Sequence, residues 1–267
     1  MEKITLTPKA DEKYLVLEAE CISPDVFAGK TLDDIKELKV WEGNTTWPLG
    51  KFFEITGTVA AKPEDQAIVV NGSVPRVKYI GSRMTNGAIL CKGDVDMYCG
   101  AWMKGGSIIV KGNADAFAAI QMEGGQLLIE GNAGNYLGAS YRGDWRGMKG
   151  GEIVVNGNAG CDIGEYMMGG TITVKGNVDI NAGIHAGRAV GAKEPGGKIV
   201  IMGNAIGRVG GQMIRGNIYV LGNIETMMPG FALKSTEDVD FEGKKTPFKV
   251  YTGDRAEAGK GTLYVKA

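Results

Sequence analysis

The stretch Gly100-Ala-Trp-Met103-Lys-Gly-Gly106-Ser-Ile108-Ile-Val110-Lys-Gly112 is one of seven copies of a pattern that runs through the middle of the chain. Each copy begins with a start residue, which is usually Gly, and three residues later there is usually a Met. The sequence Gly-x-Ile-x-Val-x-Gly or a close variant follows. The copies are predicted to begin at Gly81, Gly100, Ala119, Trp145, Gly164, Gly191 and Gly210. Most starts are 19 residues apart, and two longer gaps of 26 and 27 residues carry insertions. A fixed period of this length indicates a repeat protein whose copies stack on one another.

Each copy predicts a short strand, because apolar and polar residues alternate and one face of the strand therefore turns inward. The inward pairs are Ile89/Cys91, Ile108/Val110, Leu127/Ile129, Ile153/Val155, Ile172/Val174, Ile199/Ile201 and Ile218/Val220. A Gly-Asn corner usually follows, as at Gly131-Asn132, and we expect positive φ there because both residue types tolerate it. A second apolar alternation after the corner predicts a second strand in each coil.

Coils of this kind bury their inner face only by stacking along an axis. We therefore predict an all-β fold, a parallel β-helix of about seven 19-residue rungs with an N-terminal cap. The expected hand is right, because parallel crossovers almost always take it. Like residues should then form ladders, one of corner asparagines and one of the methionines Met84, Met103, Met122, Met148, Met167 and Met213. Two copies depart from the pattern: Ala119 replaces the first Gly, and Glu194-Pro195 is predicted to replace the Met of the sixth copy.

The flanking segments lack the repeat. Residues 1–80 are predicted to cap the first rung, residues 81–225 to form the repeat domain, and residues 226–267 to form a C-terminal extension. In the cap we expect a turn at residues 24–29, a short helix at residues 31–38 with Thr31 as N-cap, and strands at residues 15–17, 52–55, 68–70 and 77–80. The extension is charged and irregular at residues 233–247, and residues 262–265 alternate like a strand. It is either a cap or a docking segment.

Two insertions interrupt the predicted repeat, residues 139–145 with Arg146 after them, and residues 184–191. They fall at the same predicted corner two rungs apart, so their bases should lie roughly 10 Å from each other. Aromatic residues and arginines dominate protein interfaces, so we predict one interface patch. Its members are Tyr141, Arg142, Asp144, Trp145, Arg146, His185 and Arg188. In the alternative, Trp145 packs on the coil while Arg142 and Asp144 bond within their own loop.

Composition narrows the class of protein. The 43 glycines and only 8 prolines indicate tight turns and not disorder or collagen. The net charge is −1 with acidic and basic residues interspersed, which gives no reason to expect nucleic acid or an anionic membrane as partner. The four cysteines have neither CxxC nor metal spacing, which favours reduced thiols in a reducing compartment. The N-terminus lacks an apolar signal region and no apolar run is long enough to span a bilayer, so a cytoplasmic location is expected.

The chain offers little chemistry of its own. It has one histidine, and the outward strand residues, such as Lys111 and Glu130, differ from copy to copy and form no repeated carboxylate pair or calcium cluster. The glycine pairs do not sit in strand-turn-helix units, so they are no dinucleotide fingerprint. We therefore predict no catalytic, cofactor-binding or metal-binding residue in this chain, while a proton-transfer role of His185 at a partner's site stays open.

The repeat, the stretch Gly138-Ala-Ser-Tyr141-Arg142-Gly143-Asp144-Trp145-Arg146-Gly147-Met148 and the segment Pro24-Asp25-Val26-Phe27-Ala28-Gly29-Lys30 together resemble the C subunit of formylmethanofuran dehydrogenase from methanogenic archaea. The resemblance covers most of residues 1–225. The repeat alone is also similar to the Gly-rich C-terminal domain of the large subunit of glutamate synthase, a right-handed β-helix. The extra N-terminal cap and the insertion at residues 141–146 argue against a stand-alone domain of that kind.

The resemblance implies a complex that reduces carbon dioxide and fixes it as formylmethanofuran in methanogenesis. In that family other subunits carry a tungsten or molybdenum pterin, iron–sulfur clusters and the zinc of an amidohydrolase-like subunit, and the C subunit has no cofactor. The implied role here is a non-catalytic scaffold that docks the redox and amidohydrolase subunits in a larger hetero-oligomer. Two alternatives are a subunit whose Arg142, His185 or Arg188 reaches a partner's active site, and the C subunit of the related formyltransferase/hydrolase complex of methylotrophic bacteria.

Overall fold

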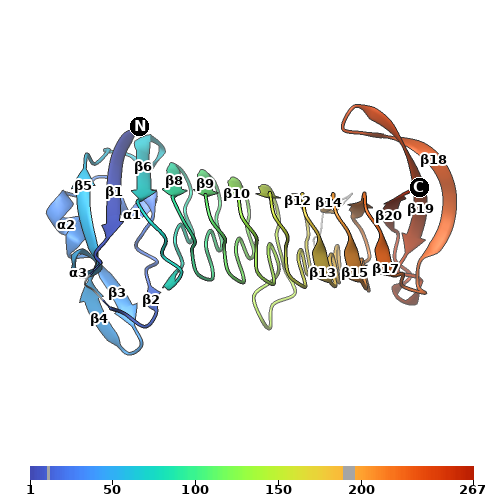
Figure 1. Ribbon diagram of the computed structural model, residues 1–267, viewed down its shortest axis with the longest axis horizontal. Helices are drawn as coiled ribbons and strands as arrows, with labels where there is room; N and C mark the ends of the chain where they lie inside the picture. The colour runs from blue at the N-terminus through green and yellow to red at the C-terminus, as the bar shows by residue number, and fades with distance from the viewer. Residues whose placement is uncertain (11–12, 189–195) are drawn as a thin grey trace.

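The computed structural model describes residues 1–10, 13–188 and 196–267, and its strands stack into one long coil (Figure 1). Each repeat copy contributes one strand to the same side of the coil. These strands are β8 (Ala88–Cys91), β9 (Ser107–Val110), β10 (Gln126–Ile129), β11 (Glu152–Val155), β12 (Thr171–Val174), β14 (Lys198–Ile201) and β16 (Asn217–Val220). Each pairs in parallel with the next and in register, so that Ile89, Ile108 and Leu127, for example, are successive partners. The large parallel sheet and the predicted strands are thus confirmed, while the right hand and the count of seven rungs stay predictions.

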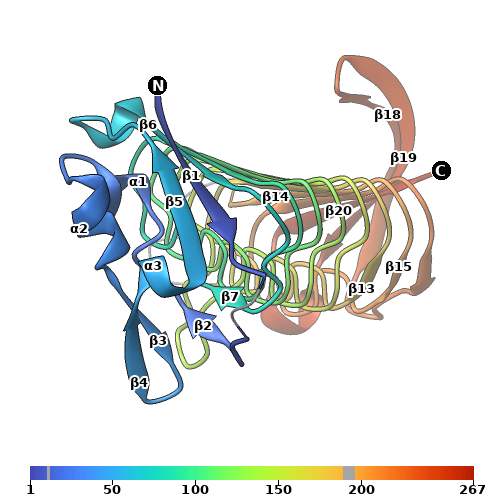
Figure 2. The same cartoon turned by 60° about the vertical axis from the view of Figure 1, so that its left-hand side comes forward.

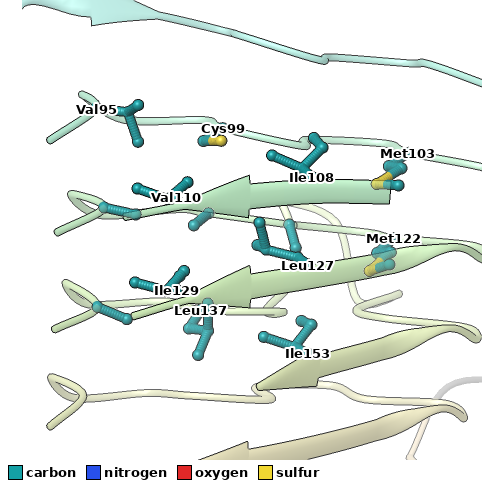
Figure 3. Packing of buried hydrophobic residues seen from close by; sticks show 14 of the residues in the cluster. Val95, Cys99, Met103, Ile108, Val110, Met122, Leu127, Ile129, Leu137 and Ile153 are labelled. Atoms are coloured by element: carbon teal, nitrogen blue, oxygen red, sulfur yellow. The ribbon is translucent and has the colours of Figure 1, made fainter. Parts of the chain in front are cut away.

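The inside of the coil is filled by the residues that the alternation predicts. All the predicted inward pairs are buried, and Figure 3 shows several of them stacked on one another at successive strands. The six methionines of the predicted ladder are fully buried as well. Burial of one such side chain stabilises the fold by about 1.5–3 kcal/mol relative to an exposed one, so stacking is the main source of stability.

The backbone bonds correct two of the predicted copy starts. The amide of each start residue donates to a carbonyl one coil earlier, as Gly100 does to Ile80 and Ala119 to Cys99. In the next coil the amide that does this belongs to Gly138, not Trp145. Two coils later it belongs to Gly183, whose amide donates to the Ile163 carbonyl. Gly191 lies outside the described residues.

Both insertions therefore lie inside a coil, after its start residue. The first lies between Gly138 and Met148, whose amide donates to the Gly138 carbonyl as Met103 donates to Gly100. In the later coil Ala186 makes the same bond to Gly183 and is buried, so Ala186 takes the methionine position. The predicted replacement, Glu194-Pro195, lies outside the described residues. The first insertion thus precedes the methionine position and the second follows it, so the prediction of one shared corner was wrong in detail.

The corner asparagines form the predicted ladder, but the expected reason for the glycines was wrong. Each side-chain oxygen accepts from the backbone amide of the next corner; the Oδ1 of Asn132, for example, lies 2.8 Å from the Asn158 nitrogen. Neither Gly131 nor Asn132 has positive φ. Glycine is needed for closeness instead: a Cβ on Gly131 would lie 2.6 Å from both the Gly112 carbonyl oxygen and the Asn113 Oδ1.

The second strand of each coil is shorter than the first. Later coils contribute β13 (Val178–Ile180), β15 (Ala205–Gly207) and β17 (Ile224–Thr226), which pair in parallel. Earlier coils keep this side together by single bridges, as between Ala114 and Ala133. The contacts between these second strands are short and largely made by alanine. The large parallel sheet that runs from β8 to β16 is therefore the main packing face of the coil.

The N-terminal segment covers one end of the coil (Figures 1 and 2). β1 (Glu2–Pro8) lies between β5 (Phe53–Gly57) and β6 (Gln66–Val70), and β6 continues the parallel sheet onto β8. A smaller sheet consists of β2 (Leu17–Glu18), β3 (Lys39–Glu42), β4 (Thr45–Pro48) and β7 (Val77–Lys78).

The helical parts of this end are α1 (Pro24–Phe27), α2 (Leu32–Lys36), α3 (Leu49–Phe52) and the 3-10 turn η1 (Pro63–Asp65). α2 confirms the predicted helix, with Thr31 and Asp34 in a capping box that satisfies two terminal amides. The predicted turn at residues 24–29 is wrong over its first part, where proline at the first helical position begins α1.

The C-terminal segment closes the other end with a long hairpin, β18 (Ala232–Phe241) and β19 (Lys244–Gly253), followed by η2 (Arg255–Glu257) and β20 (Gly261–Lys266). β20 confirms the predicted last strand and pairs in parallel with β16. The expectation of irregular structure at residues 233–247 was wrong. These residues form a regular hairpin because Phe241 and Phe248 pack on the outward ring of Tyr219. Their ring centres lie 5.2 and 5.9 Å from that of Tyr219, and this contact anchors the strongly charged hairpin.

Candidate interaction site

One column of side chains runs along the turns of the coil, each two residues after a start residue. Its members are Arg83, Trp102, Gln121, Tyr166, His185 and Gln212, all with positive φ, and they are called the turn column below. Neighbours in the column contact each other: the Trp102 indole donates to the Gln121 Oε1 at 2.7 Å, and the rings of Tyr166 and His185 stack at 4.4 Å. His185 is therefore part of the regular coil, which corrects its predicted place in the second insertion.

The first insertion is held over this column by a small polar network. The Gln121 side-chain nitrogen donates to the Asp144 Oδ2 and to the Arg146 carbonyl, each at 2.8 Å. Arg146 in turn donates to both oxygens of Asp144, at 2.8 and 2.9 Å. The loop projects from the coil between β10 and β12 (Figure 1).

Tyr141 and Arg142 lie outside this network, and Arg142 lies over a second, aromatic column. The rings of Tyr79, Tyr98, Phe117 and Tyr136 stack at 4.7–5.1 Å. The Arg142 guanidinium lies 5.5 Å from the ring centre of Tyr136, and Tyr141 contacts Trp102. Sequence reasoning missed this column, although an aromatic residue stands two positions before each of the first starts.

The remaining predicted residues surround one pocket of about 840 Å³. It is lined by Gly143, Asp144, Trp145, Arg146, Tyr166, His185, Arg188 and Gln212. The structure thus brings together Asp144, Trp145, Arg146, His185 and Arg188. It places Arg142 to one side on the aromatic column and Tyr141 against Trp102. Residues 189–191 of the second predicted insertion lie outside the described residues.

The alternative of local packing holds for one part of the loop and not for the other. Asp144 does bond within its own loop, to Arg146. Trp145, however, is 71% exposed and does not pack on the coil. An interface role for this surface stays a prediction.

Charge within the site is shaped by neighbours and burial. The hydrogen bonds from Arg146 lower the pKa of Asp144 to about 2, so the carboxylate stays ionised and paired well into the acid range. Burial lowers the pKa of His185 from 6.5, against the raising effect of its bond to Gln212. The Gln212 Oε1 accepts from Arg188 and lies 2.7 Å from the His185 Nε2, so Nε2 carries the proton. The buried Nδ1 has no hydrogen-bond partner among the described residues, so a second proton there would be costly.

We expect His185, the single histidine, to titrate below 6.5 in the folded chain. Below pH 6.5 the unfolded chain then binds the extra proton first, so the free energy of unfolding decreases as the pH falls and levels off below the folded-state pKa. NMR titration of its ring protons measures the pKa directly. His185→Gln, which repeats the residue found at Gln121 and Gln212, should remove the part of this pH dependence that lies just below pH 6.5, while carboxylates with lowered pKa such as Asp144 keep theirs at more acid pH. An unchanged slope just below pH 6.5 in that variant, or a folded-state pKa at or above 6.5, would contradict the account.

Groups that could bind metal or react are sparse in the described ranges. No cluster of three or more His, Cys, Asp or Glu side chains there could hold a metal ion. The four cysteines are free thiols, and burial raises the pKa of Cys99 to about 12. No helix within residues 1–10, 13–188 and 196–267 is long and apolar enough to cross a membrane.

Comparison with known proteins confirms the resemblance drawn from the sequence. No protein-family profile matches the chain. The C subunit of the tungsten-containing formylmethanofuran dehydrogenase 2 of Methanococcus maripaludis is 49% identical over 149 residues, which cover 55% of this chain and 53% of that protein. The corresponding subunit of Methanothermobacter wolfeii is 47% identical over 98 residues, 37% of this chain and 36% of that protein. The molybdenum-containing type from Methanothermobacter marburgensis is 51% identical over 92 residues, 34% of this chain and 22% of that protein.

These matches span between about a fifth and about half of the length of the curated relatives. Among solved structures, a chain of the formyltransferase/hydrolase complex from Methylorubrum extorquens, crystallised with methylofuran, superposes with a TM-score of 0.85. It is 26% identical, and the match covers 98% of this chain and 99% of that one. The chain is therefore similar to the C subunits of formylmethanofuran dehydrogenases and to a chain of the formyltransferase/hydrolase complex.

Proposed function

We propose that this chain is the structural C subunit of a formylmethanofuran dehydrogenase complex, a right-handed β-helix of about seven rungs that docks the redox and amidohydrolase subunits. The complex would reduce carbon dioxide and fix it as formylmethanofuran. The tungsten- or molybdenum-pterin, the iron–sulfur clusters and the zinc would belong to the partner subunits. The observation that carries the proposal is the identity of about half over the matched segments to the C subunits of both metal types.

The surface supports a docking role in a way that the fold alone does not, since one fold serves many functions. Trp145 and Tyr141 are 71% and 45% exposed and lie on the insertion between Gly138 and Met148. Large aromatic side chains kept at the surface contribute most when a partner buries them. A scaffold that displays them on a rigid coil loses little ordering entropy on binding.

Native purification through a tag on this chain tests the proposal. Co-purification of a pterin-type redox subunit and a zinc amidohydrolase, with tungsten or molybdenum and iron in the sample, is the expected result. Recovery of the chain alone as a monomer would overturn the scaffold role.

A second candidate is the C subunit of a formyltransferase/hydrolase complex, favoured by the superposition over nearly the whole chain. The same purification separates the two. Partners without tungsten, molybdenum or iron–sulfur clusters would favour this candidate, whereas a redox subunit excludes it.

Direct participation in a partner's site is the remaining alternative, with Arg142, His185 or Arg188 as the contributing residues. Alanine substitutions distinguish it from docking. Loss of assembly supports the scaffold, and intact assembly with lost turnover supports participation.

A further inference from the structure

We propose that the pocket beside the first insertion receives an acidic segment of a partner subunit, with one carboxylate on Arg188 and a neighbouring aromatic or large apolar side chain against Trp145. The inference rests on the proposed docking function and names the chemistry of what docks. Three observations carry it: the shape of the pocket, its unused hydrogen-bond donors and its rigid floor.

The pocket has the size and walls of a side-chain receptacle. Its volume of about 840 Å³ is that of several side chains. One wall is the exposed indole of Trp145, and another is the stacked pair of Tyr166 and His185. Rigid aromatic walls around a concave surface are what a buried anchor residue of a partner requires.

Four of the arginines lie in or beside the pocket. The chain has eight arginines, Arg76, Arg83, Arg142, Arg146, Arg188, Arg208, Arg215 and Arg255. Arg146 and Arg188 line the pocket, where Asp144 is the only carboxylate among the described lining residues. Arg208 acts electrostatically on His185, and Arg215 donates to the Gly187 carbonyl at the start of the second insertion. Acids balance part of this charge, since Asp144 pairs with Arg146 and Glu257 pairs with Arg188. Complementarity to an acidic segment therefore depends on the donors that remain free on Arg188.

Arg188 is the arginine with capacity left for a carboxylate. Its Nη1 bonds to the Glu257 Oε2 at 3.1 Å and to the Gln212 Oε1 at 3.3 Å. A guanidinium carries five N–H donors, and those on Nε and Nη2 have no partner within residues 1–10, 13–188 and 196–267. The Nε and Nη2 of Arg146, by contrast, already donate hydrogen bonds to Asp144. A bidentate carboxylate therefore fits Arg188.

The floor of the pocket is fixed from the far end of the chain. Asp254 is only 2% exposed, and its Oδ2 accepts from the Gln212 backbone amide at 3.0 Å. Gln212 then holds His185 and Arg188 through its Oε1. A pocket ordered before binding loses less entropy when an occupant enters.

The test is photo-crosslinking within the purified complex, with Trp145 replaced by p-benzoylphenylalanine. Trp41, which is 50% exposed in β3 of the N-terminal cap and does not line the pocket, takes the same replacement as the matched control. The expected product joins position 145 to a partner segment with Asp or Glu within a few residues of an aromatic or large apolar side chain. An assembled complex without a product at 145, or a product with a basic or uncharged segment, would overturn the inference.

Arg188→Gln adds the charge test, with Arg76→Gln in the cap as its control. The crosslink yield at 145 should fall roughly 10-fold for Arg188→Gln and stay unchanged for Arg76→Gln. An equal yield in both variants would contradict the carboxylate site. If the unsubstituted chain co-purifies with no partner, that is a separate result, because it contradicts the proposed function itself.

Discussion

Deletion of residues 141–147 is expected to leave a coil that folds and to abolish capture of the partner subunits. The deletion joins Ser140 to Met148 and restores the three-residue step that links Gly164 to Met167 in a regular coil. None of the deleted residues belongs to the buried apolar core, and the backbone bond between coils that is lost is the one from the Gly147 amide to the Tyr166 carbonyl. The thermal midpoint should therefore change by only a few degrees. Partner retention should fall roughly 100-fold, because the exposed Trp145 and the loop arginines leave together.

Circular dichroism melts and tag purification measure the two halves of this prediction. Removal of residues 101–107 instead is the matched control, because the same length cut from a regular coil should destroy folding. A deletion variant that still holds its partners normally would show that the insertion is not the docking element. A variant that fails to fold would show that the corrected register at Gly138 is wrong.

Features of the fold that follow from patterns within a few residues could be predicted from the sequence, whereas those that depend on contacts between coils could not. The strands and the inward pairs follow from alternation, which acts within a few residues, and the methionine ladder follows from the period. The coil starts at Gly138 and Gly183 were misplaced because a Trp or a Gly one insertion later fits the same loose pattern. Only the hydrogen bonds between coils distinguish the two registers.

The candidate site was predicted in its residues and not in its arrangement. Aromatic and arginine content singled out Trp145 and Arg188, and both line the pocket. The division that sends Arg142 to the aromatic column depends on ring stacking between coils. Gln212 and Glu257 were missed altogether, since a glutamine in a turn and an acid near the C-terminus carry no local signal of a shared pocket.

Gly131→Ala is expected to destabilise the coil by roughly 2–4 kcal/mol, the sum of forced overpacking and weakened bonds. The new Cβ would lie 2.6 Å from the Gly112 carbonyl oxygen, so one coil must move from the next. That movement lengthens the bond from Gly131 to Gly112 and the one from Asn132 to Asn113, now 3.0 and 2.8 Å. Thermal melts give the size of the effect, and amide exchange at Asn132 locates it.

Gly211→Ala is the control that separates closeness from the general effect of replacing glycine. Gly211 has no positive φ, and a Cβ there would lie 3.4 Å or more from its neighbours, an ordinary contact. The substitution should be neutral or stabilise the fold by up to about 1 kcal/mol, because the unfolded chain loses conformational freedom while the fold accepts the methyl group. If both variants lost the same stability, the corner glycines would be needed for flexibility and not for closeness. A large difference means that the spacing between coils, set by Gly-Gly contact at each corner, holds the asparagine ladder in register.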